Sequence, residues 1–260
     1  MTRDLIAVDR AGPIATVVLN RPEKLNAMSV AMNRRLREIM EACDADLDLR
    51  CVVLRGTGGR AFCVGADIAE FEATRSSAAK AREYARLGNP ALQSVRECRH
   101  PVVALIQGLC VGGGFGLAAL ADIKVCGESS RFGVPIKRLG LVESHEELEA
   151  VVRAIGAGPT LEILLTGDLL DARDALRVGF VNRVVPDDRV EEEAYAVARK
   201  IAEGAPLAAR WHKRFVYDLV ARRPLTDEER DVAYHCFDTE DFRIGYRAFL
   251  AKTTPRFVGR

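Results

Sequence analysis

Hydrophobic and polar residues follow strand-like and helix-like patterns in turn along the first half of the chain. Short apolar runs rich in β-branched residues predict strands, and they lie at residues 5–10, 14–21, 51–56, 60–67, 100–108 and, as two short strands, 123–135. Residues 29–46 place apolar side chains at helical spacing behind Ser29, which suits an N-cap. Residues 76–99 also predict helix, with an expected break near 88–90. Strands alternating with helices predict a layered α/β core.

The second half of the chain is mostly helical in pattern. Short helices ended by glycine are predicted at residues 146–156, 159–167 and 171–179, and one strand at 181–186. From 188 to 249 nearly every segment predicts helix, with breaks near 204–206, 223–224 and 237–239. We interpret this tail as a helical layer that faces a partner.

Composition narrows the class of protein. The chain has 260 residues and a formal net charge of +1, which argues against a nucleic-acid or membrane partner chosen by bulk charge. Its longest apolar runs are shorter than a bilayer span. Asp4 and Asp9 interrupt the N-terminal segment, so no secretory signal is expected and the predicted location is the cytoplasm.

The cysteines and histidines do not form metal-binding patterns. Seven cysteines are present without a C-x-x-C pair, and we interpret them as small buried hydrophobic residues in a reducing compartment. No two of the four histidines share an i, i+4 spacing, so no metal site is predicted.

The stretch CVGGGFGLAALAD, residues 110–122, is a candidate anion site. A strand that ends in glycines and leads into a helix exposes backbone N–H groups beside a positive helix end. A nucleotide phosphate or pyrophosphate is disfavoured, because no G-K-[ST] follows and Leu117 interrupts the dinucleotide pattern. Close helix packing through glycine remains an alternative. An oxyanion that develops during a reaction would need a second N–H donor, and FCVGADI, with a turn beginning at Ala66, is the candidate.

Several motifs together resemble one enzyme family. The stretches NRPEKLNAM, GRAFCVGADI, GLCVGGGFGLAALADIKV and LTGDLLDARDALRVGFVNRVVP, and the closing EDFRIGYRAFLAKTTPRFVGR, occur in the order and spacing of the crotonase superfamily, the enoyl-CoA hydratase/isomerase family. The resemblance covers essentially the whole chain. It implies an α/β spiral of repeated β-β-α units over residues 1–200, which binds acyl-CoA, and a C-terminal helical trimerisation region over 201–260.

The resemblance also implies the ligand and its contacts. The substrate is an acyl-CoA thioester, with no cofactor beyond the coenzyme A that the substrate carries, and the assembly is a homotrimer or a dimer of trimers. The amides of Ala66 and Gly113 form the oxyanion hole that stabilises an enolate. Coenzyme A runs along Lys24, Leu25 and Ala27, beside Val64, Asp67 and Ile68, and Phe249 and Lys252 reach it from a neighbouring subunit. Solvated surface lysines are the alternative for Lys24 and Lys252.

The chain departs from this family at the acids of the hydration reaction. A hydratase holds water between two glutamates, one as base and one as acid. By family position these would be residues 116 and 136, which here are Gly116 and Ile136. Standard hydration is therefore not carried over, and isomerase, hydrolase or other lyase chemistry is favoured. The alternative is a catalytically silent homo-oligomer that binds acyl-CoA.

The loop GLVESHEELEA has instead gained ionisable groups. Glu143 and Ser144 lie where related isomerases place a catalytic acid, so Glu143 and His145 are the candidate proton-transfer groups. Either could also activate water for hydrolysis. A helix start competes with this interpretation, because Ser144 and Glu147 fit a capping box and Glu146 and Glu149 an acidic first turn. For Glu143 and His145 both interpretations stay open.

Overall fold

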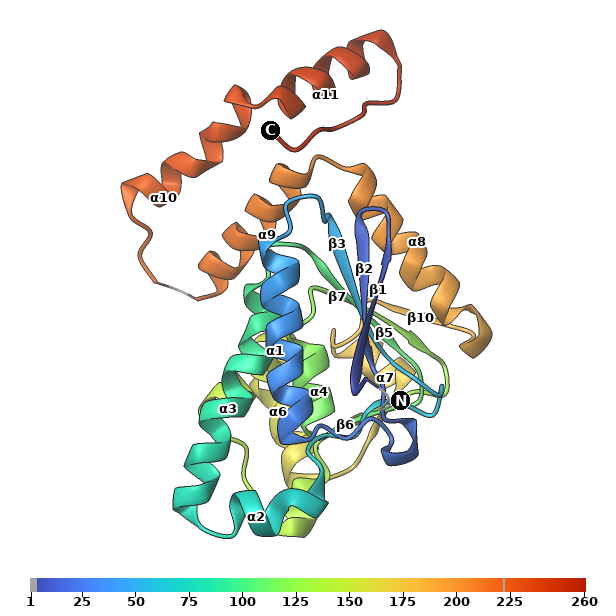
Figure 1. Cartoon of the computed structure of the whole chain (residues 1–260), viewed down its shortest axis with the longest axis vertical. Helices are drawn as coiled ribbons and strands as arrows, with labels where there is room; N and C mark the ends of the chain where they lie inside the picture. The colour runs from blue at the N-terminus through green and yellow to red at the C-terminus, as the bar shows by residue number, and fades with distance from the viewer. Residues whose placement is uncertain (1–3, 222) are drawn as a thin grey trace.

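The computed structural model describes residues 4–221 and 223–260, and its strands form two sheets (Figure 1). The larger sheet has the order β1 (Ile6–Ala11), β2 (Ile14–Leu19), β3 (Cys51–Gly56), β5 (Val102–Ile106), β7 (Ile123–Gly127) and β10 (Arg183–Val185). The smaller sheet has the order β4 (Ala61–Cys63), β6 (Leu109–Val111), β8 (Arg131–Gly133) and β9 (Leu170–Asp171). From β3 to β8 successive strands alternate between the two sheets, as the repeated β-β-α units of the predicted spiral require.

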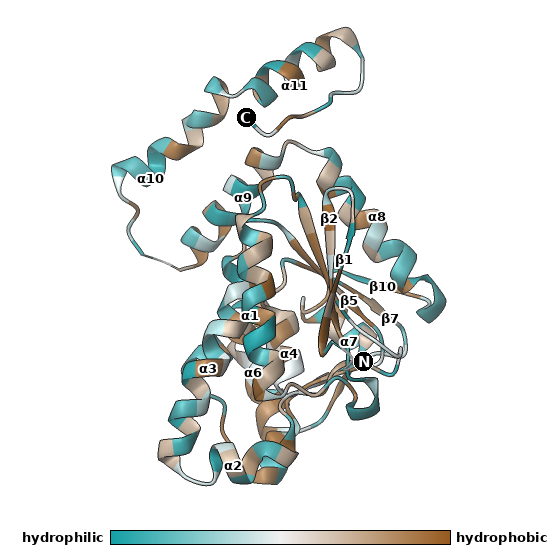
Figure 2. Cartoon of the chain, in the orientation of Figure 1, coloured by the Kyte–Doolittle hydropathy of each residue, from teal (hydrophilic) through white to brown (hydrophobic). Residues whose placement is uncertain are grey.

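Strand pairing in the larger sheet follows from its connections. A tight turn joins β1 to β2, so these pair antiparallel, with Ile6 opposite Leu19. Longer crossovers join β2, β3, β5, β7 and β10, which pair in parallel. Both faces of a parallel sheet are normally covered. Every residue of β2 and β5 is accordingly buried, and Figure 2 shows these strands as mostly hydrophobic.

Helices cover both faces of the larger sheet, with α1 (Val30–Ala45) and α4 (Gly113–Ala119) on one face and α8 (Val190–Glu203) on the other. The other helices are α2 (Phe71–Arg75), α3 (Ala78–Glu97), α5 (His145–Ile155), α6 (Ala157–Thr166), α7 (Ala172–Arg177), α9 (Pro206–Val220), α10 (Asp227–Asp231) and α11 (Glu240–Ala251). Short 3-10 helices lie at η1 (Pro22–Lys24), η2 (Ile68–Glu70), η3 (Pro135–Leu139), η4 (Asp187–Arg189) and η5 (Val232–Asp238). Ser29 caps α1 as predicted, because its side chain accepts a hydrogen bond from the Met32 amide.

The break predicted near residues 88–90 in the helical segment 76–99 is wrong. Helix α3 runs without interruption from Ala78 to Glu97 and contains Pro90. Proline inside a helix removes one backbone hydrogen bond and crowds the preceding turn. The helix continues because it packs along α1, where Gly88 and Ala91 are buried. Tertiary packing here outweighs the local penalty.

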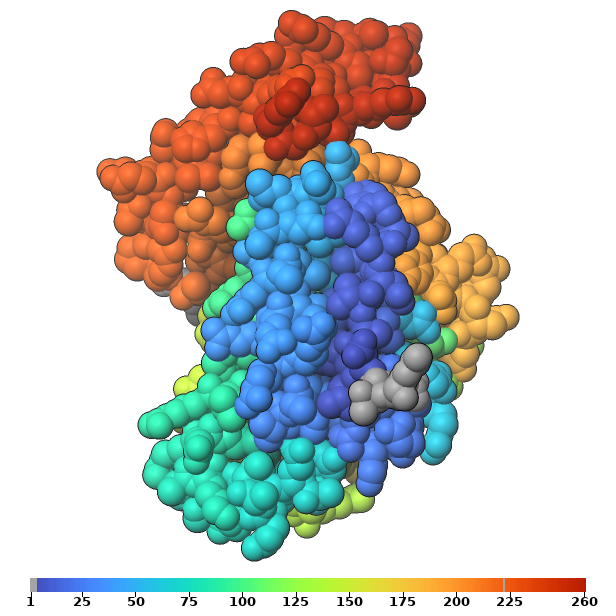
Figure 3. Space-filling view, in the orientation of Figure 1, coloured from blue at the N-terminus to red at the C-terminus, as the bar shows by residue number. Residues whose placement is uncertain are grey.

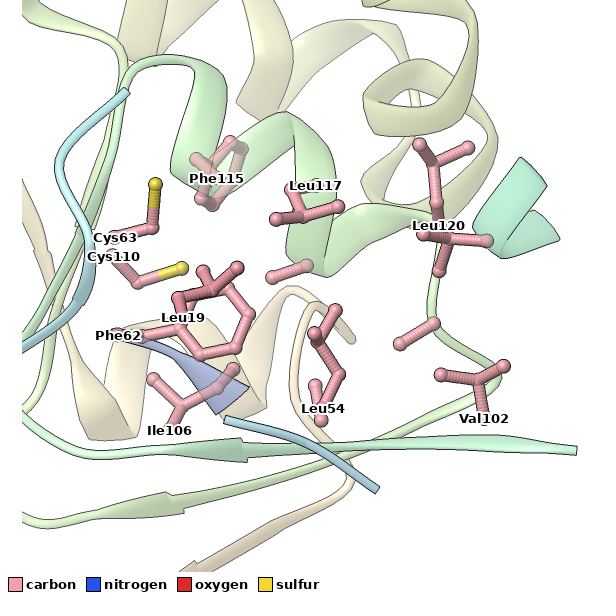
Figure 4. Close-up of a cluster of buried hydrophobic side chains, with 14 of the residues drawn as sticks. Leu19, Leu54, Phe62, Cys63, Val102, Ile106, Cys110, Phe115, Leu117 and Leu120 are labelled. Carbon is pink, nitrogen blue, oxygen red and sulfur yellow. The ribbon is translucent and has the colours of Figure 1, made fainter. Parts of the chain in front are cut away.

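The main core lies between the sheets and the helices α1 and α4. Figure 4 shows Phe115 and Leu117 of α4 facing Leu19, Phe62 and Ile106 from the strands, and all five are buried. Aromatic packing continues the core toward the C-terminal half, where the Phe115 and Phe180 rings stack with centroids 4.0 Å apart. This packing fixes α4, and therefore the glycine run at its start.

A second apolar cluster lies on the opposite face of the sheet, under α8. It joins the strand residues Val53, Val103 and Val125 to Val190 and Ala194 of the helix. The predicted burial of cysteine is largely confirmed, because six of the described cysteines are buried and free, and Cys236 is half-buried. No helix among the described residues is long and apolar enough to cross a bilayer.

The last helices extend away from the sheets. Figures 1 and 3 show α10 and α11 as a lobe at the end of the molecule opposite α2. The buried Asp241 carboxylate closes this lobe by accepting hydrogen bonds from the Val258 and Gly259 amides. The predicted chain breaks in the tail are confirmed, whereas the domain boundary near residue 200 stays a prediction.

Candidate functional site

Glycine allows two backbone segments to meet at the start of α4. Gly65 has φ of +93°, and a Cβ there would lie 2.9 Å from the Gly113 nitrogen. A Cβ at Gly114 would lie 2.1 Å from the Cys63 carbonyl oxygen. Side chains at either position would push β4 and the residues that follow it away from the helix. Gly65 and Gly114 are therefore both required for the close approach of the two backbone segments.

The amides of Ala66 and Gly113 are left without partners by the local backbone pairing. Met28 donates to the Gly65 carbonyl at 2.7 Å and accepts from the Asp67 amide at 2.9 Å. Ala66 lies between these two bonds, so its N–H points to the opposite side. Gly113 opens α4, where backbone amides have no acceptor within the helix. Within the described chain, neither amide donates a hydrogen bond to a protein acceptor.

The two free amides are close enough to serve one oxygen atom. A Cβ built on Gly113 would lie 3.8 Å from the Ala66 nitrogen. Two convergent N–H donors, one of them at the positive end of a helix, form a site for a developing negative charge. The structure thus brings together the two residues that the sequence assigned to an oxyanion hole.

Two cavities meet at Gly113. The larger, of about 300 Å³, is lined by both candidate amide residues, Ala66 and Gly113. The narrower, of about 30 Å³, lies beyond it and is lined by Gly116 and Glu143 among mainly apolar side chains. The cavities share Asn89, Leu92, Gly113 and Glu147. A thioester whose carbonyl oxygen reached the amides would therefore place its neighbouring carbon atoms near this junction.

The two positions that lack the expected glutamates differ in surroundings. A Cβ on Gly116 would meet no described atom within 4 Å, so this position borders open space in the narrow cavity. Ile136 is half-buried and packs against the main core. One expected acid is thus replaced by space, and the other by an apolar side chain.

A pair of carboxyl groups at the start of α5 faces this space. The predicted capping box is confirmed: the Ser144 hydroxyl accepts from the Glu147 amide, and Glu147 Oε2 accepts from the Ser144 amide at 2.8 Å. The Glu143 carboxyl also hydrogen-bonds to Glu147. The pKa of Glu143 is raised to about 8, mainly by burial and further by the Glu147 charge and hydrogen bond, whereas the Arg75 charge opposes the rise. Glu143 is therefore mainly protonated at neutral pH.

His145 and Glu146 are both exposed, unlike this pair. His145 is exposed and lines neither cavity, and Glu146 is exposed at the rim of the narrow one. The structure therefore brings Glu143 to the glycine run and leaves His145 outside. Glu147, predicted only as part of the capping box, serves both as a helix cap and as a residue that lines both cavities.

The residues assigned to coenzyme A form a second group beside Ala66. The buried Asn26 side chain donates to the Thr57 and Ala61 carbonyls at 3.0 and 2.8 Å, which holds the loop after η1 against β4. Asp67 pairs with Arg21 at 2.8 Å, and this contact keeps the pKa of the Asp67 carboxyl below its usual range. The predicted residues Lys24, Leu25, Ala27, Val64, Asp67 and Ile68 thus lie on two joined loops, with Lys24 and Ile68 exposed.

Phe249 and Lys252 are far from these loops in the single chain. Both are exposed at the end of α11, and Figure 1 shows α11 at the end opposite α2. Neither lines the two cavities. Their assignment to the ligand of a neighbouring subunit stays a prediction.

Sequence reasoning missed Arg75 and Tyr84, which line the larger cavity. The i, i+4 spacing of Phe71 and Arg75 could have indicated a stacked pair on one helix face. The packing of Tyr84 from α3 against the same guanidinium joins two helices, and no local pattern indicates it.

Comparisons with known proteins identify the family of the chain. The model of a family described as enoyl-CoA hydratase/isomerase matches residues 9–260. A Rhizobium meliloti protein named a probable enoyl-CoA hydratase is 34% identical over 263 residues, covering 100% of both chains. A crotonyl-CoA hydratase of Syntrophomonas wolfei is 28% identical, also over 100% of both. A solved structure from Magnetospirillum magneticum, described as an enoyl-CoA hydratase/carnithine racemase, is 44% identical, with a TM-score of 0.97 over 100% of this chain and 97% of that one.

Proposed function

Because the chain belongs to the enoyl-CoA hydratase/isomerase family, we propose that this enzyme moves a proton along the acyl chain of an enoyl-CoA thioester. The observation that supports this function is the position of Glu143, which lines the cavity that begins at Gly113. The reaction class that fits best is the conversion of a 3-enoyl-CoA into a 2-enoyl-CoA.

The first step removes a proton from the α-carbon and leaves negative charge on the thioester oxygen. The Ala66 and Gly113 amides stabilise this enolate, each by about 3 kcal/mol. Both donors are fixed by the backbone before the substrate arrives. The stabilisation therefore requires little rearrangement at the moment of reaction.

Glu143 is the group that moves the proton. As a carboxylate it takes the α-proton, and the electron pair of the broken C–H bond enters the dienolate. As a carboxylic acid it returns the proton to the γ-carbon, so the double bond moves and no atom is gained or lost. A group that must act as base and then as acid works best with a pKa near the working pH. The raised pKa of Glu143 meets this requirement.

Glu147 acts as a positioning residue. It accepts hydrogen bonds from both the Ser144 amide and the Glu143 carboxyl. These contacts leave Glu143 as the member of the pair with hydrogen-bonding capacity toward a substrate. The start of α5 thus fixes the orientation of the proton-transfer group.

Standard hydration is disfavoured by two residues of this chain. Gly116 offers no acid, and Ile136 packs against the core. A water molecule between positions 116 and 136 would therefore have no general base and no general acid. Water activated at Glu143 could instead hydrolyse the thioester. Hydrolysis would release free coenzyme A, which is measured in the same assay as isomerisation.

The experiment uses (E)-3-hexenoyl-CoA and the native protein. We expect formation of 2-hexenoyl-CoA, followed by the absorbance of the conjugated thioester, with incorporation of deuterium when the solvent is D₂O. Glu143→Gln should lower the rate by about 10²–10⁴-fold. The matched control is Glu149→Gln, which changes an exposed glutamate on α5, the helix that Glu143 precedes. An unchanged rate in Glu143→Gln, or a large loss in His145→Gln, would show that the proton-transfer group is wrong.

A catalytically silent acyl-CoA-binding protein is the second candidate function. The loss of both family acids, at Gly116 and Ile136, favours it. Binding of hexanoyl-CoA and 3-hexenoyl-CoA without isomerisation, hydrolysis or deuterium incorporation would support this candidate over the enzyme.

We also propose a homotrimer, or a dimer of trimers, in which the C-terminal helices make contacts between subunits. Large apolar side chains are exposed on this lobe, among them Phe249 and Leu250 at 83% and 75%. Exposed apolar patches of this kind commonly mark an interface. In such an assembly Phe249 and Lys252 could reach the coenzyme A of a neighbour.

A further inference from the structure

Arg75 is held in a fixed orientation at the larger cavity. Its guanidinium carbon lies 4.7 Å from the centroid of the Phe71 ring and 4.1 Å from that of the Tyr84 ring. The Tyr84 hydroxyl accepts a hydrogen bond of 3.1 Å from the side chain of Asn33, which is buried on α1. Stacking on aromatic rings fixes the plane of a guanidinium and leaves its edges available for hydrogen bonds.

Those edges have no partner in the described part of the chain. Arg75 makes no ion pair or hydrogen bond with any described residue, and its Nε is buried without an acceptor. A buried charged donor without an acceptor is unfavourable. A ligand that accepts these hydrogen bonds would remove this penalty, and a carboxylate matches the planar arrangement of the donors.

The position of Arg75 selects the acyl end of the ligand. Arg75 lines the same cavity as Ala66 and Gly113, and its positive charge acts on Glu143. The exposed loop residues assigned to coenzyme A, Lys24 and Ile68, do not line this cavity. A ligand whose thioester oxygen occupied the two amides would therefore direct its acyl group, and not its phosphates, toward Arg75.

We propose that Arg75 binds a second carboxylate carried by the acyl group, so that the enzyme prefers acyl-CoA thioesters of dicarboxylic acids. This inference rests on the proposed function only in assuming that an acyl-CoA occupies the cavity. The guanidinium would accommodate the carboxylate in two parallel N–H···O bonds while the Phe71 and Tyr84 rings cover its faces. Arg75 would then determine specificity and take no part in proton transfer.

The surrounding charges restrict how the carboxylate approaches. Glu147, which acts as the anionic member of its pair, repels a second carboxylate, whereas Glu143 is mainly neutral at pH 7. The acyl carboxylate must therefore lie on the Arg75 side of the cavity, away from α5. A substrate of suitable length would satisfy both ends, with its thioester at the amides and its carboxylate at Arg75.

Binding of saturated thioesters tests this inference without depending on turnover. Glutaryl-CoA and adipyl-CoA are compared by calorimetry with hexanoyl-CoA and heptanoyl-CoA, which replace the carboxylate by an uncharged group of similar size. We expect the native protein to bind at least one dicarboxylic thioester about 10-fold or more tightly than its neutral counterpart, a typical effect for a charged hydrogen-bonded pair. Arg75→Gln should abolish this preference, and Arg75→Lys should retain part of it.

A control variant and two binding results separate a specific role of Arg75 from a general effect of charge. Arg82→Gln removes one positive charge from an exposed position on α3 and should leave the preference unchanged. Equal affinity for dicarboxylic and neutral thioesters would overturn the inference. A uniform loss for every thioester and for free coenzyme A in Arg75→Gln would also overturn it, because Arg75 would then bind the coenzyme. Failure of isomerisation alone would contradict the proposed function and leave these binding results intact.

Discussion

The Glu143 carboxyl hydrogen-bonds to the Glu147 carboxylate, and the two groups face a cavity in which the family's usual acids are missing. Glu147 is anchored to the start of α5 by the Ser144 amide, so it acts as the anionic partner. Burial and this neighbouring charge raise the pKa of Glu143 to about 8. The pair is thus the feature of the site with the clearest dependence on pH.

The first prediction concerns the pH profile of isomerisation. The reaction begins with the ionised form of Glu143, so kcat/KM should rise with pH until about 8 and then level off. Glu147→Gln removes the repelling charge, while glutamine still satisfies the capping box. The pKa of Glu143 should fall, and the rise in kcat/KM should move to lower pH, with a several-fold higher rate at pH 6.

A matched variant separates this effect from a general change in charge. Glu149→Gln removes an exposed glutamate of the same helix, one that pairs with Arg153 and Arg96. Its profile should match that of the native enzyme. Identical profiles in Glu147→Gln and the native enzyme would contradict the proposed role of the pair.

The second prediction compares two glycines of α4 that differ only in their surroundings. In Gly114→Ala the new methyl group would lie 2.1 Å from the Cys63 carbonyl oxygen, so the backbones must separate. We expect a loss of about 3 kcal/mol or more in the free energy of unfolding, since overpacking against backbone is poorly relieved. In Gly116→Ala the methyl group meets no described atom within 4 Å. Its stability should stay within about 1 kcal/mol of the native value and rise slightly, because alanine favours helix.

Urea unfolding of both variants at one protein concentration measures this difference. Equal losses in the two variants would show that the close approach of β4 and α4 is not what requires glycine. A severe loss in Gly116→Ala would mean that the space beside it is filled in solution.

Much of the fold and half of the site could be predicted from the sequence, for identifiable reasons. Strand and helix positions follow local patterns, and Ser29 and Ser144 mark helix starts through hydrogen bonds within one turn. The amides of Ala66 and Gly113 belong to short glycine motifs. The continuous α3 could not be predicted, because its Pro90 is tolerated only through packing on α1.

The polar side chains of the site depend on contacts that are distant in sequence. Arg75 acquires its orientation from Tyr84, and Tyr84 from Asn33, which lies 51 residues earlier in the chain. The distinction between Glu143 and His145 depends on which side of a helix start faces a cavity. The sequence pattern gave both residues equal support.

The third prediction concerns stability in acid. His100 is fully buried, and within the described chain neither ring nitrogen has a hydrogen-bond partner. Burial, with the nearby charge of Arg210, lowers the pKa of His100 to about 4 from its usual 6.5. The unfolded chain therefore binds a proton at higher pH than the folded one. His100 therefore does not affect the free energy of unfolding above pH 6.5. As the pH drops from about 6.5 to 4, it lowers the free energy of unfolding by up to about 3 kcal/mol.

His100→Leu should remove this part of the acid sensitivity. The measurement is the difference in free energy of unfolding between pH 7 and pH 4, compared between the variant and the native protein, since other groups titrate in both. The same difference in both proteins would show that His100 does not carry the effect.

The fourth prediction concerns the attachment of α9 to the sheet. Asp122 accepts hydrogen bonds from the Tyr217 hydroxyl at 2.8 Å and the Val102 amide at 2.7 Å, and pairs with Lys213 at 2.9 Å. The Lys213 side chain is 8% exposed, so removal of its partner leaves a charge that water solvates poorly. We expect Asp122→Ala to lower the free energy of unfolding by about 3 kcal/mol. Limited proteolysis of Asp122→Ala should cleave residues 206–220 before the rest of the chain. Uniform cleavage along the chain would contradict a local role of Asp122.

The fifth prediction concerns assembly through the C-terminal lobe. Phe249 and Leu250 are 83% and 75% exposed in the single chain, an unfavourable position for two large apolar side chains unless another subunit covers them. Light scattering of the native protein should give the mass of a trimer or a multiple of it. Phe249→Ser combined with Leu250→Ser should shift the mass toward the monomer and weaken coenzyme A binding, because Phe249 and Lys252 would no longer reach a neighbour's ligand.

The control is Leu47→Ser, which removes an apolar side chain that is 64% exposed after α1. This variant should leave the mass unchanged. A monomeric native protein, or a double variant with unaltered mass, would contradict this interface.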